Sequence, residues 1–179
     1  MPNFWNWLFV KDAGGLRGLS NIANRWIVLH IFSGLVAVWL LPASYGDIAS
    51  KTLVPSASVL IGFSFAWAGR SASLFQDKSF SRFLIENAPP IQHYVYAFQL
   101  AILVCIVFIV TNLIMISGGL GITTGYSSYD NSVNKFIMFS LGSLALRECW
   151  GVINFVNRLT LQYYAVRNFE IKKLGGKPE

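Results

Sequence analysis

Charged side chains are scarce in this sequence. Asp, Glu, Lys and Arg make up only 12% of the 179 residues, whereas hydrophobic residues make up 54% and aromatic residues 15%. An ordinary soluble domain carries about 25% charged residues. The deficit of charge excludes an ordinary soluble domain, and it predicts one compact all-α integral membrane protein.

Residues that bind metals or activate nucleophiles are also few. The chain has two histidines, His30 and His93, and neither has a Cys, His, Asp or Glu at metal-ligand spacing. The sequence contains no Gly-rich phosphate loop and no nucleophile motif. Its two cysteines, Cys105 and Cys149, lie in apolar segments, where cysteine usually packs as a small hydrophobic side chain. We therefore expect no enzyme activity, no metal and no cofactor.

Four long apolar segments are present, and they predict four transmembrane helices. A helix rises 1.5 Å per residue, so about 20 apolar residues cross a hydrocarbon core of about 30 Å. The predicted spans cover approximately residues 25–42, 54–70, 94–117 and 135–158. They form a predicted bundle over residues 25–158. In the second span Ser58, Gly62 and Ala66 recur every four residues, a pattern that lets membrane helices pack closely.

The remaining segments flank or connect these spans. Residues 1–24 are rich in Trp and Phe near their start, which predicts a segment at the membrane interface; aromatic residues that cover the helix bundle are the alternative. The polar stretch 70–90 predicts an interfacial helix or a helical extension between the second and third spans, ended by Pro89 and Pro90. The other two connections are predicted to be loops. Residues 159–179 predict a basic helical tail.

The positions of the basic residues predict the orientation. Net charge is +6, but the Lys and Arg residues border apolar segments instead of forming one stripe, so we expect a lipid bilayer and no nucleic acid as partner. Eleven of them lie in the N-terminal arm, the connection between the second and third spans, and the tail; the other two loops hold one each. By the positive-inside rule, both termini should face the cytoplasm.

Two charges interrupt the fourth span near its middle, Arg147 and Glu148. A central Arg costs about 2.5 to 3.5 kcal/mol on insertion scales, so other helices should shelter it. Depths estimated from the helical rise place three further polar residues in the same half of the bilayer: His30, Arg70 and Gln99. We predict that all five form one polar layer, with Glu148 opposite Arg70 or His30. Such a layer is either functional or a set of ion pairs that lock helices together.

The fourth span also carries a polar stripe. Its members are three or four residues apart and therefore share one helix face: Ser140, Ser143, Arg147, Gly151, Asn154 and Arg158. The stripe predicts either the lining of a water-filled pathway or a contact with the same stripe in another subunit.

These patterns favour a homo-oligomer, because a bundle of four short helices shelters few charges by itself. The predicted function is a membrane pore or channel-like effector. The alternative is a non-enzymatic membrane anchor or sensor that recruits a cytoplasmic protein through its basic tail.

Overall fold

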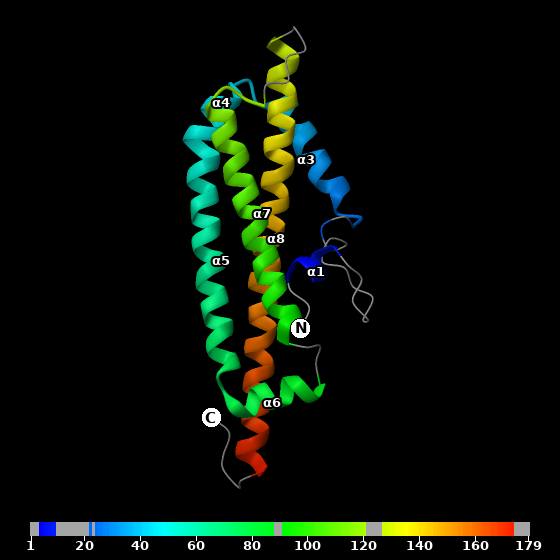
Figure 1. Cartoon of the computed structure of the whole chain (residues 1–179), viewed down its shortest axis with the longest axis vertical. Helices are drawn as coiled ribbons and strands as arrows, with labels where there is room; N and C mark the ends of the chain where they lie inside the picture. The colour runs from blue at the N-terminus through cyan, green and yellow to red at the C-terminus, as the bar shows by residue number, and fades with distance from the viewer. Residues whose placement is uncertain (1–3, 10–21, 23, 88–90, 121–126, 174–179) are drawn as a thin grey trace.

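The computed structural model describes residues 4–9, 22, 24–87, 91–120 and 127–173. These residues form helices joined by turns, with no strand among them, and the longest helices run side by side along one axis (Figure 1). Three predictions lie outside the described residues: most of the N-terminal segment, the helix end at Pro89 and Pro90, and the last residues of the tail. The predicted all-α class is confirmed.

Three helices are long and apolar enough to cross a membrane. They are the continuous helical stretch Tyr45–Phe75, the apolar part of α7 (Ile91–Ile116), and α8 (Ser127–Lys173). The first predicted span is instead the 14-residue helix α3 (Ile27–Leu40), whose length of about 21 Å is less than the hydrocarbon thickness. A bundle of four full spans is therefore not confirmed.

The predicted loop before the second span is wrong, because most of it is helical. Helix α4 (Tyr45–Ile48) continues through a wider π-helical turn, η1 (Ala49–Leu53), into α5 (Val54–Phe75). The Ser44 hydroxyl accepts a hydrogen bond from the Asp47 backbone N–H at 3.2 Å and so caps the helix. One turn later Lys51 pairs with Asp47 at 2.8 Å. Local capping and an i,i+4 pair therefore start this helix at Tyr45.

A network of polar contacts joins the helix ends at the α4 end of the bundle. Lys135 donates a hydrogen bond from Nζ to the Leu41 carbonyl at 2.7 Å, and its side chain is buried. Tyr45 bonds through its backbone N–H to Asn131 and through its hydroxyl to the Gly118 carbonyl. Lys135, the first residue of the fourth predicted span, lies within α8 and satisfies the exposed carbonyl at the end of α3.

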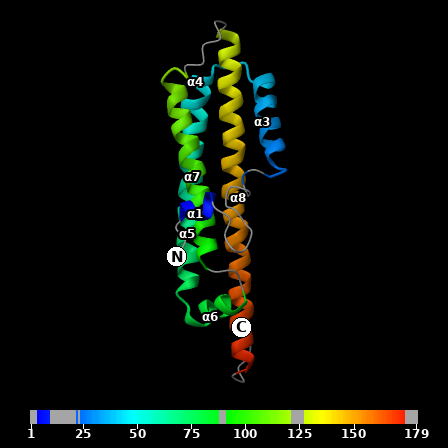
Figure 2. The ribbon, with the colours of Figure 1, turned by 45° about the vertical axis from the view of Figure 1, so that its right-hand side comes forward.

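Helix α6 (Lys78–Asn87) lies across the opposite end of the bundle (Figures 1 and 2). Phe80 and Leu84 are almost completely buried and pack with Leu159 of α8. Asp77 accepts hydrogen bonds from the backbone N–H groups of Ser79 and Phe80, so it caps the start of α6. The predicted helix in this connection is confirmed.

Helix α8 has 47 residues, which corresponds to about 70 Å. It begins eight residues before Lys135 and passes Arg158 without a break, so no helix end separates the predicted fourth span from the predicted tail. In Figure 1 its last turns extend beyond α6. Because this length is more than twice the hydrocarbon thickness, a large part of α8 lies outside any bilayer that it crosses.

The aromatic segment near the N-terminus packs on the bundle. Trp7 and Leu8 of α1 (Phe4–Phe9) are buried, and the Trp7 ring lies 5.7 Å from that of Tyr96 on α7. Trp5 and Phe9 on the other side of the helix are exposed. The structure therefore favours the bundle-covering alternative for these six residues.

The small-residue pattern of the second span faces away from the other helices. Ser58, Gly62 and Ala66 are all exposed, and nothing lies within 4 Å of a Cβ built on Gly62. The buried face of α5 carries another set spaced seven residues apart: Ala57, Ser64 and Ser71. Seven residues are close to two helical turns, so this set forms the inward face. The expected packing role of the first set is not found within the chain.

Candidate functional site

The closest packing between α3 and α8 is built from small and polar residues. A Cβ built on Gly34 would lie 2.7 Å from the Phe136 carbonyl oxygen and would also collide with the Ser140 hydroxyl. One turn earlier on α3, His30 is only 4% exposed, and its Nδ1 lies 2.8 Å from the Ser143 hydroxyl. The absence of a side chain at Gly34 thus allows the approach that buries His30. We call this contact the α3–α8 seam.

Two polar atoms in the seam are buried and have no hydrogen-bond partner among the described residues: Nε2 of His30 and the hydroxyl oxygen of Ser140. An unsatisfied buried polar group costs about 1 to 3 kcal/mol. Such groups are rare in folded proteins, and each requires an explanation such as a functional role. The seam is therefore the part of the molecule where a functional polar site is best supported.

The charged pair of the fourth predicted span lies one turn along α8 from Ser143. Nη1 of Arg147 is 3.6 Å from Oε1 of Glu148, and the two side chains are 27% and 14% exposed. The predicted pairing of Glu148 with Arg70 or His30 is not what the structure has, because the ion pair joins two neighbours on one helix. Long side chains allow this contact, although adjacent positions on a helix point about 100° apart.

Arg70 lies too far along α5 to meet Glu148. The Ser64 hydroxyl is 3.3 Å from Cys149 Sγ, which brings this part of α5 level with Glu148. Arg70 follows Ser64 by six residues, or about 9 Å along the helix axis. Its exposed guanidinium lies over the Trp67 ring at 5.9 Å. Arg70 therefore does not belong to the polar group around the seam.

Gln99 is also outside this group. It is exposed, and its neighbour Phe98 contacts Phe155, about two turns from Arg147 toward the α6 end. The five residues predicted to form one layer are thus divided. The structure brings three of them to the seam and its edge: His30, Arg147 and Glu148. The depth estimate failed for Arg70 and Gln99 because both lie further along the bundle than the charged pair, and both side chains are exposed.

The predicted stripe on α8 is divided as well. Its first members, Ser140 and Ser143, contact α3 of the same chain. Gly151, Asn154 and Arg158 are exposed, and nothing lies within 4 Å of a Cβ built on Gly151. Neither a pore lining nor a subunit contact along the whole stripe fits this arrangement, because α3 covers one half of it. Only the exposed half, Gly151 to Arg158, is accessible for a pore lining or for a contact with another subunit.

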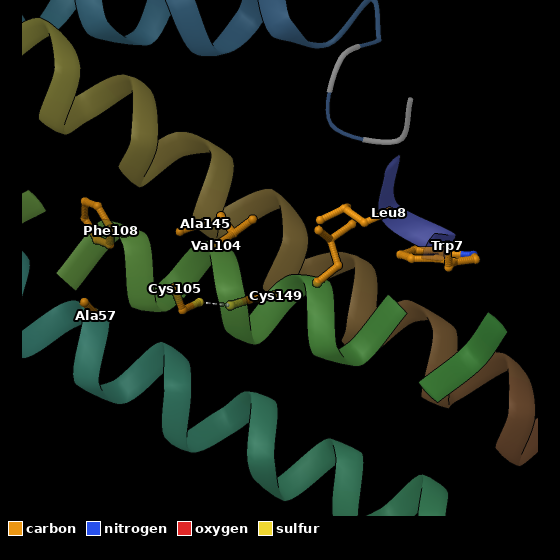
Figure 3. Close-up of a cluster of buried hydrophobic side chains, with 9 residues drawn as sticks. Trp7, Leu8, Ala57, Val104, Cys105, Phe108, Ala145 and Cys149 are labelled. Atoms are coloured by element: carbon orange, nitrogen blue, oxygen red, sulfur yellow. Dashed lines mark hydrogen bonds between the residues drawn. The ribbon is translucent and has the colours of Figure 1, made fainter. Parts of the chain in front are cut away.

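The two cysteines lie opposite each other in the bundle interior, although they are 44 residues apart in the chain. Figure 3 shows Cys105 on α7 facing Cys149 on α8, and their sulfur atoms are 3.4 Å apart. Both are free and buried, as the apolar sequence context predicts. Their mutual contact could not be read from the sequence, because it depends on how α7 and α8 pack.

A cavity of about 510 Å³ opens beside the seam. Three serines line it, but most of its wall is apolar and comes from η1, α5, α7 and α8: Leu53, Val59, Leu60, Phe108, Phe139 and Leu146. A water-filled conduction path needs polar groups along its length. This cavity is therefore unsuited to be the lumen of a pore within one chain.

The seam also contains residues that the sequence analysis missed. These are Ser33, Gly34 and Ala37, which share one face of α3 with the predicted His30 at helical spacing, and a search for small and polar residues in this short span would have found them. The described residues contain no group of three or more His, Cys, Asp or Glu able to hold a metal ion. Comparisons with protein-family models, curated proteins and solved structures found no match.

Proposed function

We propose that this chain is a non-enzymatic membrane anchor that holds a folded platform at the cytoplasmic surface and recruits a protein there. The observation that carries this proposal is the packing of α6 against α8 through Phe80, Leu84 and Leu159, all buried. This packing gives the end of α8 a defined tertiary structure beyond the apolar spans. A tail that served only as a topology signal would not need it.

The platform carries a polar pocket suited to a protein ligand. Its volume is about 290 Å³, and residues of both signs line it, including Asp77, Arg167 and Glu170. The Tyr163 hydroxyl donates a hydrogen bond to Asp77 at 3.4 Å, which links the start of α6 to α8. A pocket lined by both positive and negative side chains favours a protein segment with complementary charges. A purely basic surface would instead favour anionic lipid.

A pore is the second candidate, and the exposed half of the α8 stripe supports it. In an oligomer, Gly151, Asn154 and Arg158 of several subunits could face one another and line a path. Such a path requires either that α3 moves away from Ser140 and Ser143, or that these two residues do not line the path. The anchor proposal requires neither, and for this reason it comes first.

Two measurements on one preparation separate these functions. Reconstituted protein at physiological density should release no ions from liposomes, and affinity purification from mild detergent should retain one soluble protein. Arg167→Gln with Glu170→Gln should lose that protein, whereas Arg82→Gln with Lys78→Gln should keep it. Ion flux without a retained partner would replace the anchor proposal with the pore.

The orientation is testable with single cysteines in a chain that lacks Cys105 and Cys149. We expect Ser117→Cys, at the α4 end, to react with an impermeant maleimide in intact cells. Ser79→Cys, at the α6 end, should react only after permeabilisation. Both positions are exposed, so burial does not limit either reaction. The reverse pattern would place the platform outside the cytoplasm.

We further propose that the chain forms homo-oligomers through the exposed small-residue face of α5. Gly62 is the centre of this face, and close approach of two helices depends on its lack of a side chain. Gly62→Ile should shift the protein toward monomer in size analysis and in crosslinking within membranes. Val110→Phe, which adds bulk at an exposed site on α7, is the matched control and should leave assembly unchanged.

A further inference from the structure

The corner between the end of α5 and α6 contains a second polar pocket, distinct from the α6–α8 pocket. Its volume is about 420 Å³. Four of its lining residues share one face of α6, because the last three follow the first by three, four and seven positions: Lys78, Ser81, Arg82 and Ile85. Phe75 and Gln76 at the end of α5 complete the wall. We call this the α5–α6 corner.

The two cations of the corner are exposed and unneutralised. Within the described parts of the chain, neither Lys78 nor Arg82 has a carboxylate within ion-pair distance. The neighbouring carboxylate of Asp77 is directed elsewhere, since it accepts the N–H groups of α6 and the Tyr163 hydroxyl. The corner therefore presents two positive charges, with the Ser81 hydroxyl and the Gln76 amide beside them as hydrogen-bond donors.

The corner lies at the end of the helical stretch Tyr45–Phe75, which is long and apolar enough to cross a membrane, so we infer that this end is level with lipid headgroups. Helix α5 runs for 22 residues from Val54 to Phe75, about 33 Å, which matches the thickness of the hydrocarbon core. The corner begins where that helix ends. Ile85 is 70% exposed on the same face as the two cations. An exposed apolar side chain beside unpaired basic residues is typical of an interfacial amphipathic helix.

We propose that the α5–α6 corner binds the phosphate headgroup of an anionic phospholipid. Lys78 and Arg82 neutralise the phosphate, Ser81 and Gln76 donate hydrogen bonds to its oxygens, and Phe75 and Ile85 contact the first methylenes of the acyl chains. Complementary charge selects this occupant, because a neutral lipid or an acidic protein segment would leave either the cations or the apolar groups without a match. This site is separate from the partner-binding pocket and does not depend on the proposed function.

The test measures lipid binding to the full chain in neutral detergent. Native mass spectrometry during titration with phosphatidylglycerol should show one tightly bound lipid, and phosphatidylcholine should not replace it. Each basic residue near an anionic lipid contributes roughly a fivefold gain in affinity, so Lys78→Gln with Arg82→Gln should weaken binding about 30-fold. Glycerol phosphate at the same concentration should not compete, because it lacks the acyl chains.

A matched variant distinguishes a specific lipid-binding site from general electrostatic attraction between basic residues and anionic lipid. Arg158→Gln with Arg167→Gln removes the same charge from exposed positions of α8 and should leave the affinity within about twofold, since neither residue lines the corner. Exchanging the two cations, Lys78→Arg with Arg82→Lys, should retain binding and shows that the fold is intact. Equal losses in both charge-removing variants, or competition by glycerol phosphate alone, would overturn the proposal. Partner retention is measured separately and does not report on this site.

Discussion

Gly34→Ala should destabilise the protein, although alanine is a better helix former than glycine. The added Cβ would lie 2.7 Å from the Phe136 carbonyl oxygen and 2.8 Å from the Phe136 ring, and a backbone carbonyl cannot move aside as a flexible side chain can. Overpacking of this kind typically costs about 1 to 3 kcal/mol. We expect a lower unfolding temperature in detergent and greater exposure of His30.

Gly69→Ala is the matched control for this prediction. Gly69 also lies within a helix, but nothing is within 4 Å of a Cβ built on it. Without a clash, the change should stabilise α5 by up to about 1 kcal/mol through helix propensity. The two Gly→Ala changes should therefore shift the unfolding temperature in opposite directions. Stabilisation by both would mean that α3 does not pack on α8 as closely as the seam requires.

Glu148→Gln should also weaken the folded bundle. Removing one member of a buried ion pair leaves the other charge less compensated, at a cost of about 3 to 5 kcal/mol when both groups are fully buried. The side chains of Arg147 and Glu148 are 27% and 14% exposed, so we expect a loss of about 3 kcal/mol or less. Thermal unfolding in detergent measures this loss.

A double-mutant cycle identifies the partner of Glu148. Arg147→Gln combined with Glu148→Gln should be less damaging than the sum of the single changes, with a coupling of about 0.5 to 3 kcal/mol. Arg70→Gln combined with Glu148→Gln should be additive, because Arg70 lies about 9 Å further along the bundle. Coupling to Arg70 and additivity with Arg147 would reverse the assignment made from the structure.

Local sequence patterns predicted the class of the fold and the positions of most helices. A low content of charge and long apolar segments predict helices in a bilayer, where every backbone polar group must be satisfied within its own segment. The helix between the second and third predicted spans was also readable, since its apolar and polar residues alternate with helical period. These features depend only on residues close together in the chain.

Helix boundaries were less predictable than helix existence. The stretch from Tyr45 was expected to be a loop, but the Ser44 cap and the Lys51–Asp47 pair make it helical. The first span was expected to cross the membrane, yet α3 has only 14 residues. Apolar composition shows that a segment avoids water, but it does not determine how much of that segment is helical.

The amino-acid sequence alone determined that the chain is apolar, helical and charged near the middle of its last span. Only the tertiary structure decided which polar groups meet. Gln99 and Arg70 were expected beside Glu148 because of their estimated depth, but both lie further along the bundle and are exposed, whereas Gly34 lets α3 approach α8 and bury His30 against Ser143. The depth of a residue can be estimated from its position along one helix. Contact between two residues also depends on how their helices are rotated and offset relative to each other, which packing across the whole bundle determines.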